Sequence, residues 1–245
     1  MKKILAALLT LALLLGATFA MADAIVGGTN AEFAPFEYIG DDGEYAGFDM
    51  ELIQYIAEEL GMELKIENMY FDGLLSALEV GTIDLVISAM TITEERKQGA
   101  LFSDPYFVAT QAVIVKEGYE GIKAIADIAD KKVAVQDGTT GHFMVQDDFG
   151  VPAANIESFK ASTDTVLELN AGRVDCIVID DAVAQNFLNA YEGLTIVQGL
   201  DMPIEEYGMA IQMGNDDLLA AINGALAAIK ADGRYDELIA KYFAE

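Results

Sequence analysis

One arginine of this chain stands where helix electrostatics would not favour a cation. Residues 84–106 read DLVISAMTITEERKQGALFSDPY: after a buried strand, Thr93 is typical of a helix N-cap, and two acids occupy the first helical turn. Arg96 lies in the same turn, where a cation opposes the helix macrodipole by about 0.3–1 kcal/mol. An anion held at the junction of strand and helix would compensate for this cost, so the sequence predicts an anion-binding site at Arg96.

Two further strand ends carry polar groups that could meet a ligand. Residues 131–136 predict a strand that runs into Asp137-Gly138-Thr139-Thr140-Gly141, and a glycine-containing turn before a helix presents free N–H groups to a carboxylate or phosphate. The turn has neither the GK[ST] of a P-loop nor the GxGxxG of a dinucleotide site, and a plain tight turn explains it equally well. Asp180 ends another apolar run, where its carboxylate could contact a ligand or cap the helix before Ala182.

The elements that must position these groups alternate between strands and helices, which predicts an α/β protein with mainly parallel sheets. Residues 24–28 and 62–66 are predicted strands. Between them, Asp49 is predicted to cap an amphipathic helix. Asp72 is predicted to open the next helix, which stops near Gly81.

A helix–glycine–strand unit occurs twice in the sequence. LSALEVGTIDLVIS at residues 75–88 matches VLELNAGRVDCIVID at residues 166–180 in its apolar helix, its glycine, its aspartate and the strand that follows. Two units of one design suggest two lobes, although such units are common in α/β proteins and one similar pair could arise by chance.

The N-terminal residues 1–22 have the features of a secretory signal peptide. Lys2 and Lys3 precede an apolar run over residues 4–15, and Ala20-Met21-Ala22 is a small-residue cleavage site, with cleavage after Ala24 as the alternative. No later run reaches the roughly 20 apolar residues that a membrane-spanning helix needs. We therefore expect a mature protein that is exported to the periplasm.

Cysteine, charge and histidine exclude several classes of protein. Cys176 is the only cysteine and lies in an apolar strand far from the cleavage site, so we expect neither a lipid anchor nor an internal disulfide. The formal net charge of −27 repels nucleic acid and anionic lipid, so neither is an expected partner. His142, the only histidine, has no partners at metal-ligand spacing, and we expect no metal and no cofactor.

Eight motifs follow the order and spacing of a known family: NAEFAPFEY, GFDMELIQYIAEELG, FDGLLSAL, TITEERK, FSDPY, DGTTG, GRVDCIVIDD and EEYGMAI. By these motifs the chain resembles the polar amino acid-binding proteins of bacterial ABC importers, which are solute-binding proteins of family 3 and of the "Venus flytrap" type. The resemblance covers nearly the whole mature chain. It implies two α/β lobes, each a mainly parallel sheet flanked by helices, joined by two crossing hinge strands. The implied division places lobe 1 at residues 23–106 and 207–245, the hinge at 107–110 and 204–206, and lobe 2 at 111–203.

The resemblance also implies how the backbone of an L-amino acid is held in the cleft between the lobes. Arg96 would bind the α-carboxylate through a bidentate pair, which supplies the anion expected from helix electrostatics. Asp180 would pair with the α-ammonium, with Asp181 as the less favoured candidate. The remaining contacts would be the backbone N–H and hydroxyl of Thr91, the carbonyl of Ala89 and the backbone N–H of Thr140.

The ligand side chain would lie in a pocket made of five further positions. By the resemblance, Phe33 and Phe71 would enclose it and Ser88 would line the wall. Asn30 stands at a position that commonly carries a carboxylate in members that bind basic amino acids, and it is neutral here. With Gln136 as a second polar contact, this favours a neutral polar ligand over arginine, lysine or ornithine.

The implied function is a transport receptor that captures an L-amino acid, closes around it and docks as a monomer on the permease of an ABC importer. An enzyme is the alternative, because the fold also occurs in periplasmic dehydratases of the cyclohexadienyl or arogenate type, which need a general acid over the leaving hydroxyl. The sequence assigns no residue to that role. The sensing domain of a receptor is a third interpretation, which would need transmembrane and signalling segments.

Overall fold

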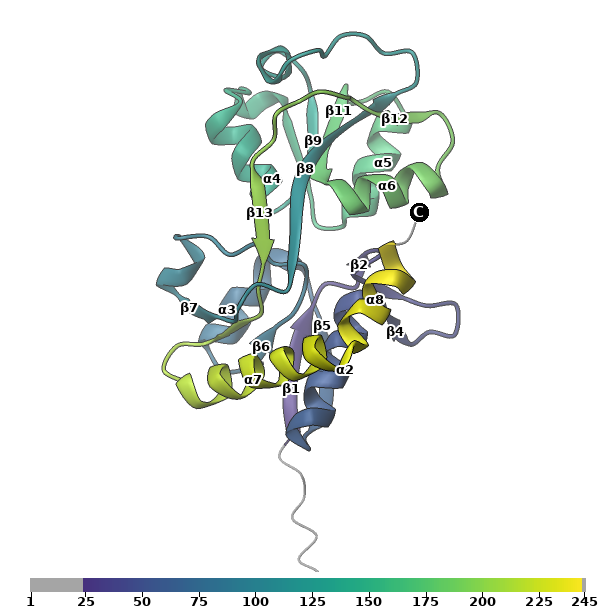
Figure 1. The fold of residues 1–245 in the computed structure, drawn as a ribbon. Helices are drawn as coiled ribbons and strands as arrows, with labels where there is room; N and C mark the ends of the chain where they lie inside the picture. The colour runs from purple at the N-terminus through teal and green to yellow at the C-terminus, as the bar shows by residue number, and fades with distance from the viewer. Residues whose placement is uncertain (1–23, 244–245) are drawn as a thin grey trace, which may run out of the picture.

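The computed structural model describes residues 24–243, so the predicted signal peptide at residues 1–22 lies outside the described part of the chain. Two lobes lie one above the other and are joined by two strands that run between them (Figure 1). Lobe 1 is built on a five-stranded sheet and lobe 2 on a six-stranded sheet. The two-lobe α/β architecture predicted from the sequence is confirmed.

Lobe 1 carries helices on both faces of its sheet. Its elements are β1 (Ala24–Thr29), β5 (Glu63–Asn68), β6 (Leu85–Val86), β7 (Ala100–Phe102), β14 (Ala210–Gln212), α2 (Phe48–Leu60), α3 (Leu74–Glu79), α7 (Asp216–Asp232) and α8 (Arg234–Phe243), with the 3₁₀ helices Phe71–Gly73 and Arg96–Gln98. The strand order is β5-β1-β6-β14-β7, and the helices α2, α7 and α8 pack together while α3 lies against β1, β6 and β14. Ile25 packs with the core of α2 and α7, whereas Val26 packs against the cluster around α3. Neighbouring strand residues therefore face opposite layers, as the pleat requires.

A short three-stranded sheet stands beside the main sheet of lobe 1. Its strands are β2 (Glu32–Phe33), β3 (Glu37–Ile39) and β4 (Tyr45–Ala46). Both pairings in this small sheet are antiparallel. It places Phe33 and Glu37 opposite one another at the side of lobe 1 that faces the site.

Lobe 2 repeats the layered plan with a sheet in the order β10-β9-β11-β8-β12, and β13 pairs with β8. Its elements are β8 (Phe107–Lys116), β9 (Val133–Gln136), β10 (Ile156–Phe159), β11 (Cys176–Asp180), β12 (Leu194–Ile196), β13 (Ile204–Tyr207), α4 (Thr140–Phe143), α5 (Ser162–Asn170) and α6 (Asp181–Ala190), with the π-helix Met144–Asp148 and the 3₁₀ helices Ile125–Ile128 and Ala153–Asn155. Cys176 is buried in β11, as its apolar surroundings predicted.

Both main sheets are mixed rather than mainly parallel. In lobe 1, β1 runs parallel to β5 and β6, whereas β14 runs antiparallel to β6 and β7. In lobe 2, β9 runs parallel to β10 and β11, whereas β8 runs antiparallel to β11 and β12. The physical reason is the crossing of the chain: β8 and β14 each follow a passage from the other lobe and enter against the parallel strands.

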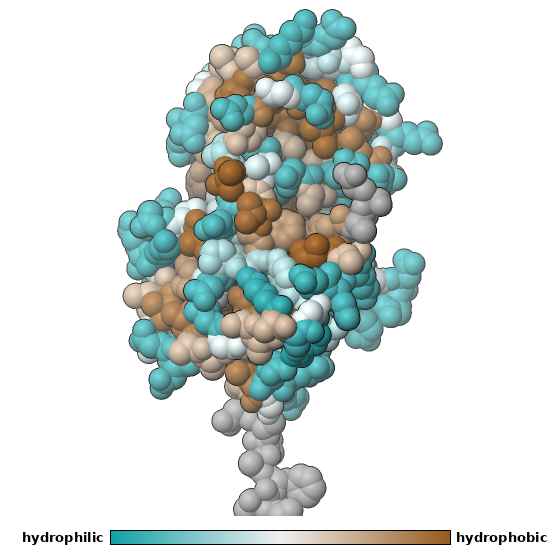
Figure 2. All heavy atoms as spheres, viewed as in Figure 1, coloured by the Kyte–Doolittle hydropathy of each residue, from teal (hydrophilic) through white to brown (hydrophobic). Residues whose placement is uncertain are grey.

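The two joining strands β8 and β13 pair antiparallel, from Phe107 opposite Tyr207 to Thr110 opposite Ile204. Figure 2 shows hydrophobic side chains gathered in the middle of its face. Val108 and Ile204 are exposed on the two joining strands. The segments expected to be the hinge, 107–110 and 204–206, lie within this paired stretch, and the hinge and the residue boundaries of the lobes stay predictions.

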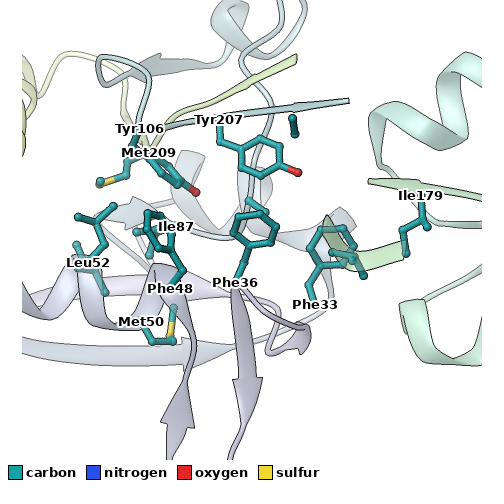
Figure 3. Close-up of a cluster of buried hydrophobic side chains, with 14 of the residues drawn as sticks. Phe33, Phe36, Phe48, Met50, Leu52, Ile87, Tyr106, Ile179, Tyr207 and Met209 are labelled. Atoms are coloured by element: carbon teal, nitrogen blue, oxygen red, sulfur yellow. The ribbon is translucent and has the colours of Figure 1, made fainter. Parts of the chain in front are cut away.

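An aromatic core lies directly below the joining strands. The Tyr207 and Phe107 rings stack 5.6 Å apart, and the Phe36 ring meets Phe107 edge-on at 4.9 Å. In Figure 3, Phe33 lies between Phe36 and Ile179, the second of which belongs to lobe 2. Fully burying each such side chain contributes about 1.5–3 kcal/mol, so this core holds the hinge and links the lobes.

Two local predictions about helix ends were wrong. Asp49 is not an N-cap: α2 begins at Phe48, with Gly47 in the cap position, and Asp49 lies buried inside the helix. The helix expected after Thr93 is only the 3₁₀ turn Arg96–Gln98, and the Thr93 hydroxyl accepts a bond from the Arg96 backbone N–H at 3.1 Å. Because one such turn has almost no macrodipole, helix electrostatics do not explain an anion at Arg96.

Candidate functional site

A small cavity of about 10 Å³ lies between the two lobes. Its lining is polar where the strands of the two sheets end and aromatic where lobe 1 closes it. All ten residues predicted from the sequence line this cavity, together with two that were not predicted. The lining residues are Asn30, Phe33, Glu37, Phe71, Ser88, Ala89, Thr91, Arg96, Gln136, Thr139, Thr140 and Asp180.

The site is built at the carboxyl ends of strands from both sheets. Asn30 follows β1 and Ser88 follows β6 in lobe 1, whereas Gln136 and Asp180 are the last residues of β9 and β11 in lobe 2. Ligands of open α/β sheets bind outside the carboxyl ends of the strands. Here the strand ends of two sheets point into one cavity, and segments that are distant in sequence become neighbours.

The Arg96 guanidinium spans the gap between the lobes. It donates to the Thr91 carbonyl at 2.7 Å and to the Gly138 carbonyl at 3.1 Å, and it lies 5.4 Å from the centre of the Phe71 ring. Burial lowers the pKa of Arg96, while the nearby Glu205 and Asp180 carboxyl groups oppose that change. A guanidinium has five N–H donors in a planar fork, so donors remain for a bidentate bond to a carboxylate.

Asp180 presents its carboxyl group to the cavity from the end of β11. The side chain is 5 % exposed, and its two oxygens accept from Gln111 Nε2 and from the Tyr207 hydroxyl. Asp180 occupies the N-cap position of α6, as one interpretation of the sequence had it, but its side chain makes no capping bond to the helix. Burial, with Glu205 adding to it, raises the pKa of Asp180 to about 7. A buried carboxyl group with this pKa is poised to ionise when a cation arrives.

A second polar cluster in the cavity contains Asn30, Ser88, Gln136 and Glu37. Gln136 Nε2 donates to Asn30 Oδ1 at 2.8 Å across the lobes, and the Asn30 backbone N–H donates to Ser88 Oγ at 3.0 Å. Ser88 Oγ in turn donates to Glu37 Oε1 at 2.8 Å. Glu37 and the adjacent Asp49 are both buried, and a protonated Glu37 can donate a hydrogen bond to the Asp49 carboxylate. The two carboxyl groups can therefore satisfy each other by sharing one proton.

Glu37 is the main residue that the sequence analysis missed. It is 1 % exposed, and burial, reinforced by the neighbouring Asp49, raises its pKa well above the usual range. The sequence did contain a feature that points to Glu37, since it is a charged residue inside the aromatic motif FAPFEY. Its direction could not be inferred, because a β-strand residue can face either side of its sheet.

Ala89 adopts a left-handed backbone conformation at the edge of the cavity, with φ of 44°. Its N–H donates to Asp49 Oδ2 at 2.7 Å, and the Tyr106 hydroxyl donates to the same oxygen at 2.7 Å. Burial raises the pKa of Asp49 to about 6. Strained residues of this kind cluster at functional sites, and Asp49 holds this one in place instead of capping a helix.

The other groups singled out from the sequence lie outside the cavity. His142 Nδ1 accepts from the Gly138 backbone N–H at 3.3 Å and lies 3.4 Å from Asp137, at the start of α4. Within residues 24–243 no group of three or more His, Cys, Asp or Glu side chains is arranged to hold a metal ion. In the same range no helix combines the length and the apolar character needed to cross a membrane.

Comparisons with known proteins agree with this architecture. The probable histidine-binding protein of Neisseria gonorrhoeae is 36 % identical over 220 residues, which is 89 % of this chain and 82 % of the relative. An ancestral arginine-binding protein bound to arginine is 42 % identical with a TM-score of 0.85, over 91 % of this chain and 100 % of the other. The structure of an ancestral arginine-binding protein bound to glutamine is 41 % identical with a TM-score of 0.86, over 92 % and 100 %.

One similar structure bears on catalysis. It is an ancestral amino acid-binding protein described as a precursor of cyclohexadienyl dehydratase, 36 % identical with a TM-score of 0.82 over 90 % of this chain and 95 % of the other. The family model that matches residues 25–245 is that of the bacterial extracellular solute-binding proteins, family 3. Fold, motifs and matched length agree, and the chain belongs to the family 3 bacterial extracellular solute-binding proteins.

Proposed function

We propose that this protein is the extracytoplasmic solute-binding component of an ABC amino acid importer. The observation that carries the proposal is the presence of opposite charges in one cavity between the lobes, with Arg96 from lobe 1 and Asp180 from lobe 2. The α-carboxylate and α-ammonium of a zwitterion match this pair. A ligand that touches both lobes stabilises the closed form, which is how binding shifts a conformational population.

The backbone of the ligand would use the predicted contacts. Arg96 would hold the α-carboxylate together with the backbone N–H groups of Thr91 and Thr140, and Asp180 would hold the α-ammonium together with the Ala89 carbonyl. Ala89 lines the cavity in a strained left-handed conformation, and strained residues of this kind cluster at functional sites.

The ligand side chain would lie between Phe33 and Phe71 and end among oxygen acceptors. Asn30 alone favoured a neutral polar ligand, but Glu37 adds a carboxyl group to the same cavity. We therefore propose a side chain with N–H donors, either a neutral amide or a guanidinium. An amide suits a protonated Glu37, whereas a guanidinium would ionise Glu37 and pair with it.

We propose that the protein works without catalysis, in the periplasm and as a monomer, and delivers its ligand to the permease of the importer. The dehydratase alternative has one observation in its favour. Glu37 is a buried carboxyl group with a raised pKa inside the cavity, which is what a general acid requires. Its bond from Ser88 and its place beside Asn30 fit recognition of a ligand side chain equally well.

A thermal-shift panel on the mature protein tests the proposed function. Carried ligand is first removed by unfolding and refolding, and the twenty L-amino acids, ornithine, citrulline and cystine are then added one at a time. A ligand at 100 times its Kd adds about 2.7 kcal/mol of stability, which gives a clear rise in Tm. A rise with one or a few amino acids, without turnover, supports the proposal. No rise across the panel, or turnover of a cyclohexadienyl carboxylate, would contradict it.

Substitution of Glu37 tests the assignment of the side-chain pocket. Glu37→Gln should weaken the binding of L-arginine by about tenfold or more relative to L-glutamine, because the variant cannot ionise to meet a guanidinium. The matched control is Glu32→Gln, a glutamate of the same small sheet that does not line the cavity. Calorimetric Kd values for both ligands in both variants provide the measurement. An unchanged ratio in Glu37→Gln would contradict a role for Glu37 in selectivity.

A further inference from the structure

Glu205 is a carboxyl group of the hinge that touches the site without lining its cavity. It lies on β13, is 7 % exposed, and faces the open groove beside the cavity. Its Oε2 accepts from the Thr91 hydroxyl at 2.6 Å and from the Thr140 hydroxyl at 2.8 Å. Thr91 follows the central strand of lobe 1, and Thr140 begins α4 in lobe 2. One oxygen atom therefore joins the hinge to both lobes.

These two bonds decide what the threonine hydroxyls can offer to a ligand. A hydroxyl has one proton to donate and two lone pairs that accept. Since both protons point to Glu205, Thr91 Oγ1 and Thr140 Oγ1 present only lone pairs to the cavity. Gln111 Nε2 lies 3.5 Å from Thr140 Oγ1, which is too long for a strong bond.

The orientation of the two hydroxyls matters because the α-ammonium requires hydrogen-bond acceptors and the α-carboxylate requires donors. An α-ammonium carries three donors, whereas an α-carboxylate carries only acceptors. Hydroxyls that present lone pairs attract the ammonium and leave the carboxylate to Arg96 and the backbone N–H groups of the two threonines. An α-hydroxy acid has one donor where the amino acid has three, so it gains less from the same hydroxyls.

We propose, building on the proposed function, that Glu205 is a positioning residue that orients the Thr91 and Thr140 hydroxyls as acceptors and so makes the site select an α-ammonium. Glu205 acts through the two threonines and does not touch the ligand. Its neighbour Glu206 is exposed on the same strand and offers a matched control with an equal change in charge.

The test compares amino acids with their α-hydroxy analogues. Calorimetry measures Kd for L-arginine and L-glutamine, each against the analogue with a hydroxyl in place of the α-amino group. In Glu205→Ala the preference for the amino acid should fall by about tenfold, because the hydroxyls can turn and donate. Glu205→Gln should keep most of the preference, since its amide oxygen can accept both bonds, and Glu206→Gln should leave it unchanged.

Equal losses for the amino acid and the hydroxy acid in Glu205→Ala would overturn the inference, because a merely structural role weakens both. If Glu205→Ala fails to fold, Glu205→Met keeps the side-chain volume and removes the acceptor. In a Thr91→Val, Thr140→Val background, Glu205→Ala should change the preference no further, and an additive change would also overturn the inference. Failure of the wild-type protein to bind any amino acid would instead contradict the proposed function itself.

Discussion

The helix–glycine–strand units of the two lobes share one scaffold and differ in their chemistry. In lobe 1, Asp84 Oδ2 accepts from the Val26 N–H and the Asp84 N–H donates to the Val26 carbonyl, both at 2.8 Å. In lobe 2, Asp175 makes the same two bonds with Lys132, again both at 2.8 Å. Each aspartate ties the start of its strand to the neighbouring strand, so the repeated aspartate is structural in both lobes.

The two units differ in the residues that follow at the ends of their strands. After β6 the chain passes through Ser88 and the left-handed Ala89 before it reaches Arg96, whereas β11 ends in Asp180 and continues directly into α6. Lobe 1 thereby supplies a cation, and lobe 2 supplies an anion. The comparison teaches that the residues the two copies share build the scaffold, while those in which they differ face the cavity.

Removal of Arg96, the cation that lobe 1 supplies, should have the largest effect on amino acid affinity. Arg96→Ala should weaken amino acid binding by about 2–5 kcal/mol, at least roughly 30-fold in Kd, because the α-carboxylate loses its charged partner. The matched control is Arg173→Ala in the lobe 2 unit, since Arg173 is exposed and pairs with Glu168 on the surface. Calorimetry on both variants, with circular dichroism to check the fold, provides the measurement. Equal affinities in the two variants would sink the assignment of Arg96.

Removal of Asp180, the anion that lobe 2 supplies, should have a smaller effect on affinity and should change how affinity depends on pH. The pKa of Asp180 is raised to about 7 without ligand, and an ammonium beside it would lower that pKa. Binding therefore favours the ionised form, so affinity should be full above about pH 7 and fall as the pH drops below that value. Asp180→Asn should weaken the binding of L-glutamine, whose side chain does not ionise Glu37, by about 10- to 100-fold at pH 8 and abolish this dependence.

Calorimetry between pH 5 and pH 8 measures the dependence for the wild-type protein and the variant. Asp181→Asn serves as the control, because Asp181 bonds to Thr110 and Ala182 outside the cavity and should leave the dependence in place. A dependence that survives in Asp180→Asn would mean that another group titrates.

Substitutions in the part that the two units share should have the smallest effects on ligand binding. Gly81 and Gly172 have φ of 74° and 70°, and a Cβ at either position meets only the end of a flexible side chain, at 3.4 Å and 3.7 Å. Each glycine→alanine variant should therefore lose only the backbone cost of a left-handed alanine, about 1–2 kcal/mol of unfolding free energy. The expected Tm decrease is about 2–4 °C per kcal/mol, without a change in ligand Kd. A large affinity change in either variant would show that the shared scaffold also shapes the site.

Much of the fold follows from patterns that are local in the sequence. Apolar runs marked the strands, Gly81 and Gly172 marked the helix ends, and the repeated unit indicated two lobes. The starts of helices were less predictable, since an acidic side chain near a helix start can bond elsewhere in the fold instead of capping the helix. Asp49 looked like a cap, but its carboxyl group bonds to Ala89 and Tyr106, which lie 40 and 57 residues away in the chain.

The candidate site was predictable only through the combination of eight motifs. Single residue types carry too little information, because a buried Phe33 or Phe71 is more often core than pocket. The resemblance brought ten of the cavity residues together, and it did so without the direction of any side chain. Glu37 was missed for that reason, and with it the case for a guanidinium ligand.

The sequence by itself determined the alternation of strands and helices, the acidic surface, the family and the residues at the strand ends, because these depend on composition and on spacing along the chain. The tertiary structure decided which of those residues meet. It set Arg96 against carbonyls from both lobes, gave Asp180 its raised pKa through burial, and placed Glu205 between two threonines. The physical reason is that burial, hydrogen-bond direction and charge proximity depend on distances across the fold, which the order of residues does not contain.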